Sequence, residues 1–343
     1  MANTPAPAQI QAAKQLLASM GITPEDLAAT TVTSTAPTFA EYVPVVAGAV
    51  SSGALRTYGS YWNRVVERWG PRRIDEPTPT EIKQFAEWVK ANTVRRRNAH
   101  GGLGAVENFI GAMRCLYRHA GNDGLIPESF NPALKVPKPR RAESLRRAIT
   151  DTRLDEINET VSTTGDDPAL DALIVRLHTE TACRRGGALG LRPRDLDQDD
   201  CLVYLREKGE KSRWQPVSPT LMNALLDHVS NRGTGDRDEQ LLRYRSGEPI
   251  TRRRYDYIWT RLGECLPWVA TQQVSAHWLR HTTLTWVERN FGFAVAQAFA
   301  GHAKDRDAAT TSIYTRASIH EIAASVAALT NEPHPLAPSD ATT

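Results

Sequence analysis

Residues 201–217 read CLVYLREKGEKSRWQPV, and this stretch separates the fold from a purely helical one. Its first part, 201–205, has the apolar and β-branched content of a short strand, and its last part, 213–217, has a similar character. Between them, Lys208-Gly209-Glu210-Lys211 is a polar turn that contains a glycine. The pattern predicts one β-hairpin.

Helical spacing of apolar residues dominates the chain on both sides of this hairpin. Four or five amphipathic helices are expected between residues 39 and 117, and one of them begins at the capping sequence Thr78-Pro79-Thr80-Glu81. The other helices are expected at 150–161, 169–181, 219–231, 252–266, 277–290, 294–300 and 319–329. We therefore expect a mainly α protein with one small antiparallel sheet.

Length and composition predict two domains. The chain has 343 residues, 41% of them hydrophobic and 24% charged, which is typical of a globular protein. We expect a flexible N-terminal segment at 1–35, a helical domain at 36–135, an extended basic linker at 136–148, a second domain at 149–331 and a disordered tail at 332–343. The linker prediction depends on its prolines and on the run Lys138-Pro139-Arg140-Arg141.

Charge is unevenly distributed along the chain. The net charge is only +3, but residues 36–148 carry 18 Lys and Arg against 10 Asp and Glu, whereas residues 149–343 have a net charge of −4. Clustered positive charge favours a polyanionic partner such as DNA, because phosphate contacts release counterions. The alternative is a basic face that only contacts solvent. The most basic runs outside the linker are 95–97 and 252–254.

Several classes of site have no support in the sequence. Four cysteines lie far apart without paired spacing, so we expect reduced, mostly buried thiols and neither a zinc site nor a disulfide framework. No phosphate-binding glycine loop and no pair of carboxylates suited to Mg²⁺ is evident, so no metal or cofactor is predicted. The sequence shows neither a signal pattern nor an apolar run long enough to span a membrane, and we expect a cytoplasmic protein.

Six residues in a fixed order carry the chemical argument. Arg184 lies at a break between two predicted helices, and Lys208 lies in the hairpin turn. His277 and Arg280 are three residues apart, so they share one face of a helix. Gly301-His302 follows an apolar helix, and Tyr314 lies in a polar stretch twelve residues beyond His302. Each position taken alone is more often an ordinary surface or core residue.

Taken together, the ordered set resembles the tyrosine recombinase, or phage integrase, family over residues 36–330. The first box of that family matches Thr181, Arg184 and Gly190-Leu191, and its hairpin box matches residues 208–213 with Pro216. The remaining boxes match His277-x-Leu279-Arg280-His281, Gly301-His302 and Tyr314-Thr315. The resemblance implies a helical, SAM-like core-binding N-domain and an α+β catalytic domain with a small antiparallel hairpin sheet.

The resemblance also implies a role for each residue in a site-specific recombinase that works without metal or ATP. Arg184 and Arg280 would bind the non-bridging oxygens of the scissile phosphate, since guanidiniums make bidentate, permanently charged contacts. Tyr314 would be the nucleophile that forms a 3′-phosphotyrosyl link, and Lys208 would protonate the departing 5′ oxygen. By the same resemblance, His277 would act as base or proton shuttle and His302 would donate a hydrogen bond to the phosphate.

Two departures from the family pattern leave questions open. The family usually has an acidic residue three positions after the first arginine, whereas this chain has Gly187, so another group must orient Arg184 or the site is weaker. The interval from His302 to Tyr314 is about three residues longer than the commonest family spacing, by resemblance. Lys211 is close enough in sequence to exchange roles with Lys208.

Double-stranded DNA with a specific recombination site is the expected partner. The resemblance implies a homo-tetramer on DNA, joined through the C-terminal helix at 319–329, although that helix would alternatively pack against its own domain. An accessory protein that sets direction is also expected. Predicted DNA contacts are Arg95, Arg96, Arg97, Lys138, Arg140, Arg141, Lys211, Arg213, Arg252, Arg253 and Arg254. A topoisomerase-like relaxing enzyme and a catalytically silent DNA-binding regulator are the alternative functions.

Overall fold

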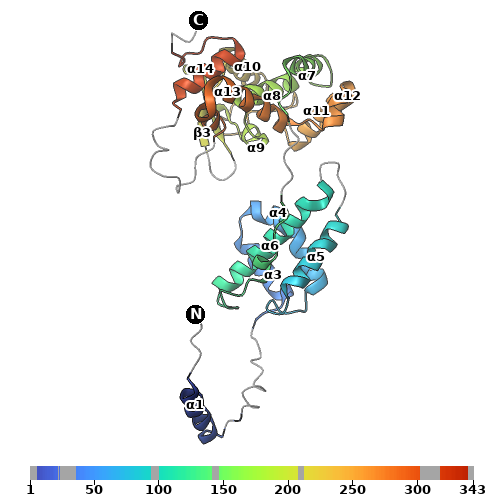
Figure 1. Ribbon diagram of the computed structural model, residues 1–343. Coiled ribbons are helices and arrows are strands. Elements are labelled where there is room, and N and C mark those ends of the chain that lie inside the picture. The colour runs from blue at the N-terminus through green and yellow to red at the C-terminus, as the bar shows by residue number, and fades with distance from the viewer. Residues whose placement is uncertain are drawn as a thin grey trace. The chain divides into compact units, whose positions relative to one another are not determined.

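The structure is a computed structural model in which the chain forms two compact units, Met1–Ser144 and Leu145–Thr343 (Figure 1). It describes residues 6–21, 23, 36–93, 100–140, 147–207, 212–301 and 317–338. Each unit has its own hydrophobic core, and we describe each by itself. The predicted mainly α fold with one small sheet is confirmed in this part of the chain.

The core of the N-terminal unit is built by four helices: α3 (Phe39–Ala49), α4 (Ser52–Trp69), α5 (Pro79–Ala91) and α6 (Leu103–Asn122). The predicted capped start is confirmed, because the Thr78 side chain accepts a hydrogen bond from the Glu81 N–H at 3.2 Å. Helix α6 packs against both α4 and α5 and presents a nearly continuous buried face. The buried Trp62 indole donates to the Ala112 carbonyl of α6 at 3.1 Å, which fixes these two helices together. A further helix, α1 (Pro7–Ser19), lies in the N-terminal segment.

The predicted linker begins inside the N-terminal unit rather than outside it. Val136 is buried in that core, and the Arg114 guanidinium donates to its carbonyl at 2.8 Å. Arg114 also donates to the carbonyl of Ala133 at 3.1 Å. The first residue of the predicted extended segment is therefore held by a side chain of α6, and the exposed Pro137 that follows does not prevent Val136 from packing.

The C-terminal unit places its helices around α8 (Pro168–Thr181). Those that pack against α8 are α7 (Asp151–Thr163), α9 (Arg185–Leu189), α10 (Pro219–Arg232), α13 (Ala276–Phe299) and α14 (Ile319–Thr330). Helix α11 (Arg252–Cys265) packs against both α12 (Pro267–Gln272) and α7, and α11 and α12 lie side by side in Figure 1. No helix among the described residues is long and apolar enough to cross a membrane.

The predicted hairpin is present as β2 (Leu202–Arg206) and β3 (Ser212–Pro216), paired antiparallel with Leu205 opposite Arg213. A two-residue strand, β1 (Leu196–Asp197), extends the sheet in the order β1-β2-β3, and the sequence did not predict it. The sheet packs against α9 and α14. The hairpin therefore lies next to the break between α8 and α9 where Arg184 is located.

Helix α13 is bent at Gly292, whose φ of 85° and ψ of 169° are not helical. This bend corresponds to the gap between the two helices predicted at 277–290 and 294–300. Beyond it, Phe299 is buried with Val287 and with Val326 of α14 in a separate apolar cluster. Beyond the bend, the end of α13 packs against α14.

The C-terminal segment differs from its prediction as a disordered tail. His334 is buried with its Nε2 3.3 Å from the Cys201 carbonyl, and the Glu332 carboxylate accepts from the Thr220 N–H at 3.2 Å. The prediction was wrong for residues 332–336, because polar side chains rather than an apolar pattern hold this segment. We call residues 332–336 the C-terminal strap.

The apolar face of α14 is covered by its own unit. Ile322, Ala323 and Val326 are buried, and they pack with residues of α13. Of the two alternatives for this helix, the structure therefore has packing within the chain, and the face predicted to join protomers is not exposed.

Candidate active site

Arg184 lies at the break between two helices, as predicted. Helix α8 ends at Ala182, which adopts a left-handed conformation with φ of 48°, and Arg184 is the N-cap of α9. The intervening Cys183 carbonyl accepts a hydrogen bond from His178 Nδ1 at 3.0 Å, which leaves Nε2 to accept from the buried Tyr255 hydroxyl at 2.9 Å. This buried chain of hydrogen bonds fixes the backbone from which Arg184 extends.

Arg280 approaches the same place from α13. Its guanidinium is buried, with 3% of the residue exposed, and it donates to the carbonyls of Ala182 and Ala300, the latter at 2.7 Å. Those two carbonyls are at the C-terminal ends of α8 and α13, where helix dipoles favour positive charge. Two helix ends therefore aim one guanidinium, although Ala182 and Arg280 are 98 residues apart in sequence.

Glu207 joins the two arginines and was not predicted. Its carboxylate follows β2, has 2% of its side-chain surface exposed, and forms an ion pair with Arg184. Its Oε1 also accepts from the Arg184 N–H at 2.8 Å and lies 3.9 Å from Arg280 Nη1. The signal that was available is physical, because arginines gathered in a buried site require a countercharge.

Arg213, which the sequence predicted as a DNA contact, lies largely buried in this site. Its side chain is only 12% exposed, with Nη1 3.3 Å from Glu207 Oε2 and Nη2 donating to the Thr181 carbonyl at 3.2 Å. Its side chain extends from β3 to Glu207 and to the last residue of α8, Thr181. We call Arg184, Arg213 and Arg280 the arginine cluster.

Burial and repulsion between guanidiniums lower the pKa values of two arginines in the cluster. Burial, followed by the charge of Arg184, lowers the pKa of Arg280 to about 10. Burial also lowers the pKa of Arg213. Burial alone would raise the pKa of Glu207, but the hydrogen bond from the Arg184 N–H and the three guanidinium charges hold it below its usual range. At neutral pH the described groups are three cations around one anion.

Of the remaining predicted catalytic residues, only His277 is among the residues that the structure describes. His277 is exposed in the first turn of α13. Lys208, His302 and Tyr314 lie outside the described residues. The described neighbours of Lys208 and His302 adjoin the arginine cluster. Glu207 is part of the site, and Gly301 has a φ of 65° that brings it against Arg213, so a Cβ there would be 2.6 Å from Arg213 Nη1.

The predicted DNA contacts have different environments. Lys138, Arg140, Arg252 and Arg253 are exposed, while Arg95, Arg96, Arg97, Arg141 and Lys211 lie outside the described residues. Arg254 is buried, with its guanidinium 2.6 Å from Asp171 and 2.8 Å from Asp166. The prediction for Arg254 was therefore wrong, because this residue faces the core of the unit. Arg261 shares the fully buried Asp171 carboxylate at 2.9 Å.

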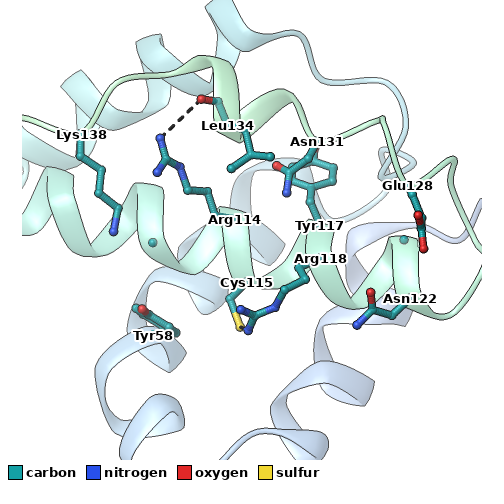
Figure 2. A pocket seen from close by; sticks show the side chains of 12 residues that line it. Tyr58, Arg114, Cys115, Tyr117, Arg118, Asn122, Glu128, Asn131, Leu134 and Lys138 are labelled. Atoms are coloured by element: carbon teal, nitrogen blue, oxygen red, sulfur yellow. Dashed lines mark hydrogen bonds between the residues drawn. The ribbon is translucent and has the colours of Figure 1, made fainter. Parts of the chain in front are cut away.

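A basic groove is present in the N-terminal unit, and its cationic lining consists of Arg114, Arg118 and Lys138 (Figure 2). The groove has a volume of about 620 Å³. Among the described residues, the Tyr117 hydroxyl and Asn131 Oδ1, both in its lining, are buried without a hydrogen-bond partner. The three cations outnumber the one carboxylate in the lining, that of Glu128, and this positive charge favours an anionic partner.

The arginine cluster and the basic groove are both typical of an enzyme that acts on phosphodiesters. Comparison with known proteins supports this class. The sequence pattern of the phage integrase family matches residues 147–321, just over half of the chain. Tyrosine recombinase XerD of Mycobacterium tuberculosis is 30% identical over 294 residues, which cover 80% of this chain and 90% of that protein. XerD of Lacticaseibacillus casei is 27% identical over 242 residues, covering 67% and 78%.

A solved structure has the same fold. A lambda integrase tetramer bound to a Holliday junction matches with a TM-score of 0.61 and 14% identity, covering 92% of this chain and 88% of that one. The chain therefore belongs to the phage integrase family. It is a tyrosine recombinase that binds DNA and breaks and rejoins its strands, which confirms the predicted enzyme class.

Proposed function

We propose that this recombinase acts on a specific duplex site and cuts each strand through Tyr314, without metal or ATP. The observation that supports this most strongly is the convergence of Arg184 and Arg280 on Glu207 from different helices. Three guanidiniums and one carboxylate have a net charge of +2 among the described groups. That charge complements the two negative charges of a pentacoordinate phosphodiester in its transition state.

The proposed step transfers the phosphoryl group between oxygens. The Tyr314 oxygen forms a bond to phosphorus while the bond from phosphorus to the 5′ oxygen breaks, and the released electron pair goes to that oxygen. Lys208 gives a proton to the 5′ oxygen, and His277 takes the proton of the tyrosine hydroxyl. His302 donates a hydrogen bond to the phosphate. Attack by a 5′ hydroxyl of another strand on the phosphotyrosine reverses these steps and rejoins DNA.

A nicked suicide duplex tests the nucleophile, because loss of the short cleaved fragment traps the covalent adduct. We expect wild type to give an adduct on denaturing gels and Tyr314→Phe to give none while it still binds the duplex. DNA taken from the flanks of the gene supplies the candidate sites. A Tyr314→Phe adduct as strong as that of wild type would contradict the assignment.

The two hairpin lysines are distinguished by the leaving group. A duplex with sulfur at the scissile 5′ position releases a thiolate that needs no proton donor, since a thiol pKa is near 8.5, far below that of an alcohol. We expect Lys208→Ala to cleave the oxygen substrate slowly and the sulfur substrate at nearly the wild-type rate. If Lys211→Ala shows this pattern instead, Lys211 is the acid.

The DNA contacts are proposed to include the basic groove and the exposed residues Arg140, Arg252 and Arg253. We expect Arg118→Ala and Lys138→Ala each to lower the salt slope of binding by about one, uniformly across sequences. Lys83→Ala is the matched control, because Lys83 is exposed on α5 in the same unit and is not part of the groove lining. An unchanged slope in both groove variants would refute this contact.

The assembly and location follow the related proteins. We propose a homo-tetramer on DNA in the cytoplasm, at the nucleoid, with an accessory protein that sets direction. Because the apolar face of α14 packs within its own unit, docking this helix on a neighbour requires it to leave Val287 and Phe299. Mass photometry with a four-way junction is expected to detect four copies, and truncation before α14 is expected to abolish the tetramer.

A further inference from the structure

Glu207 binds the backbone and the side chain of Arg184 with the same carboxylate. Oε1 accepts from the Arg184 N–H at 2.8 Å, and Oε2 pairs with the Arg184 guanidinium. Because each oxygen of the carboxylate binds a different part of Arg184, the carboxylate fixes the direction of that side chain. The contact with the N–H sets where the carboxylate lies, and the ion pair selects the rotamer of the arginine. The Arg184 side chain keeps 38% of its surface exposed, while the carboxylate that holds it is buried.

The same carboxylate limits the repulsion within the arginine cluster. Arg213 Nη1 lies 3.3 Å from Oε2, and Arg280 Nη1 lies 3.9 Å from Oε1. Both guanidiniums are largely buried, where like charges repel strongly because water does not screen them. Without Glu207 the described groups would place three positive charges together with no anion between them.

Gly187 lies beside Glu207 but contributes no side chain to the cluster. A Cβ at position 187 would lie 3.4 Å from Glu207 Cγ and 3.6 Å from Glu207 Oε1, which is ordinary contact distance, so a side chain at 187 would begin next to this carboxylate. Gly187 is also the position, three residues after Arg184, at which the sequence pattern lacks an acid. The carboxylate at the arginine cluster therefore comes from the end of β2 and not from α9.

We propose that Glu207 is the positioning residue of the arginine cluster, which replaces an acid at position 187 and holds Arg184 toward the scissile phosphate. This inference rests on the proposed role of Arg184 in binding that phosphate. Glu207 itself touches no reacting atom. It acts through Arg184, and its removal should slow cleavage much more than it weakens binding of the duplex.

A double-mutant cycle on the full-length protein tests this role. Single-turnover cleavage of the nicked suicide duplex is measured for wild type, Glu207→Gln, Arg184→Ala and the double variant. We expect Glu207→Gln to slow cleavage by about 100-fold with DNA affinity close to wild type. The double variant should be far less impaired than the product of the two single effects, because the part of the effect of Glu207 that passes through Arg184 is absent once Arg184 is gone. Glu239→Gln is the control, since Glu239 pairs with Arg243 in the same unit.

Relocating the charge provides a second test. Glu207→Ala combined with Gly187→Asp returns a carboxylate from α9, and we expect it to recover at least about tenfold of the lost cleavage rate. Glu207→Gln that cleaves like wild type, or that adds fully to Arg184→Ala, would overturn the inference. If Glu207→Gln does not fold, Glu207→Asp replaces it in the cycle, and wild-type cleavage by Glu207→Asp would also count against a role that depends on reach.

The experiments distinguish failure of the proposed function from failure of the inference about Glu207. If wild type forms no adduct that depends on Tyr314, the proposed function fails before Glu207 is tested. If wild type forms the adduct and Glu207→Gln forms it equally fast, only the inference about Glu207 fails.

Discussion

The Arg280 guanidinium is aimed by backbone carbonyls, which makes Arg280→Lys a sensitive perturbation. Its nitrogens donate to the carbonyls of Ala182 and Ala300, and only 3% of Arg280 is exposed. A lysine keeps the charge, but its single ammonium cannot occupy both positions of the planar fork. One buried carbonyl then loses its donor, which costs about 1–3 kcal/mol. We expect the C-terminal unit to lose about 2 kcal/mol of unfolding free energy and cleavage to slow by about 100-fold.

Two measurements on the full-length protein check this expectation. Pulse proteolysis in urea, with peptides from residues 145–343 followed by mass spectrometry, reports the stability of that unit. Single-turnover adduct formation on the nicked duplex reports cleavage. Arg289→Lys, at an exposed position on the same helix, should change neither quantity. Wild-type stability together with cleavage within about threefold of wild type in Arg280→Lys would refute the view that two helix ends position this guanidinium.

Three other perturbations have defined outcomes. Asp171→Asn removes the buried countercharge of two arginines and should cost about 3–5 kcal/mol in urea unfolding, whereas Asp166→Asn, at a side chain 67% exposed, should cost under about 1 kcal/mol; equal losses would contradict this. Gly301→Ala meets a φ of 65° and lies 2.6 Å from Arg213 Nη1, so cleavage should slow by at least about tenfold while DNA binding persists, and wild-type cleavage would show that this approach is not needed. Burial lowers the pKa of His228 from 6.5 to about 4, so between these pH values the unfolded chain binds a proton that the folded chain does not. The contribution of His228 to the unfolding free energy is complete above about pH 6.5 and falls by about 2 kcal/mol between pH 7 and pH 5. The variant His228→Gln should remove this dependence on pH.

The sequence predicted the elements that have a strong period or a clear boundary. The hairpin, the capped start of α5 and the long helices were found because their apolar spacing and turn residues are local signals. The strand β1 and the helix α12 were missed, since two and six residues are too short to show a period. The C-terminal strap was missed because polar contacts, such as that of His334, hold it in place, and its sequence therefore shows no apolar pattern.

The site was predicted in its residue types but not in its countercharges. Arg184 and Arg280 were recognised from their boxes, whereas Glu207 is a single acid at a strand end with no spacing that marks it. The run 252–254 looked uniformly exposed, yet a helix turns by about 100° per residue, so three consecutive residues cannot share a face. Arg254 lies on the same side as the buried Ile258, four residues on, and is therefore directed into the unit.

The transfer of the acid from position 187 to Glu207 constrains how such a site is inherited. A chain that lost an acid at 187 before it gained Glu207 would pass through a form with unneutralised arginines. A chain with both acids would place two like charges side by side, because a Cβ at 187 would lie 3.4 Å from Glu207 Cγ. The two positions should therefore change as a pair, with a small residue at one and a carboxylate at the other. Relatives that carry glycine or alanine at the first position and an acid at the second would form one line of descent, and a survey that checks only the first position would count working enzymes as inactive.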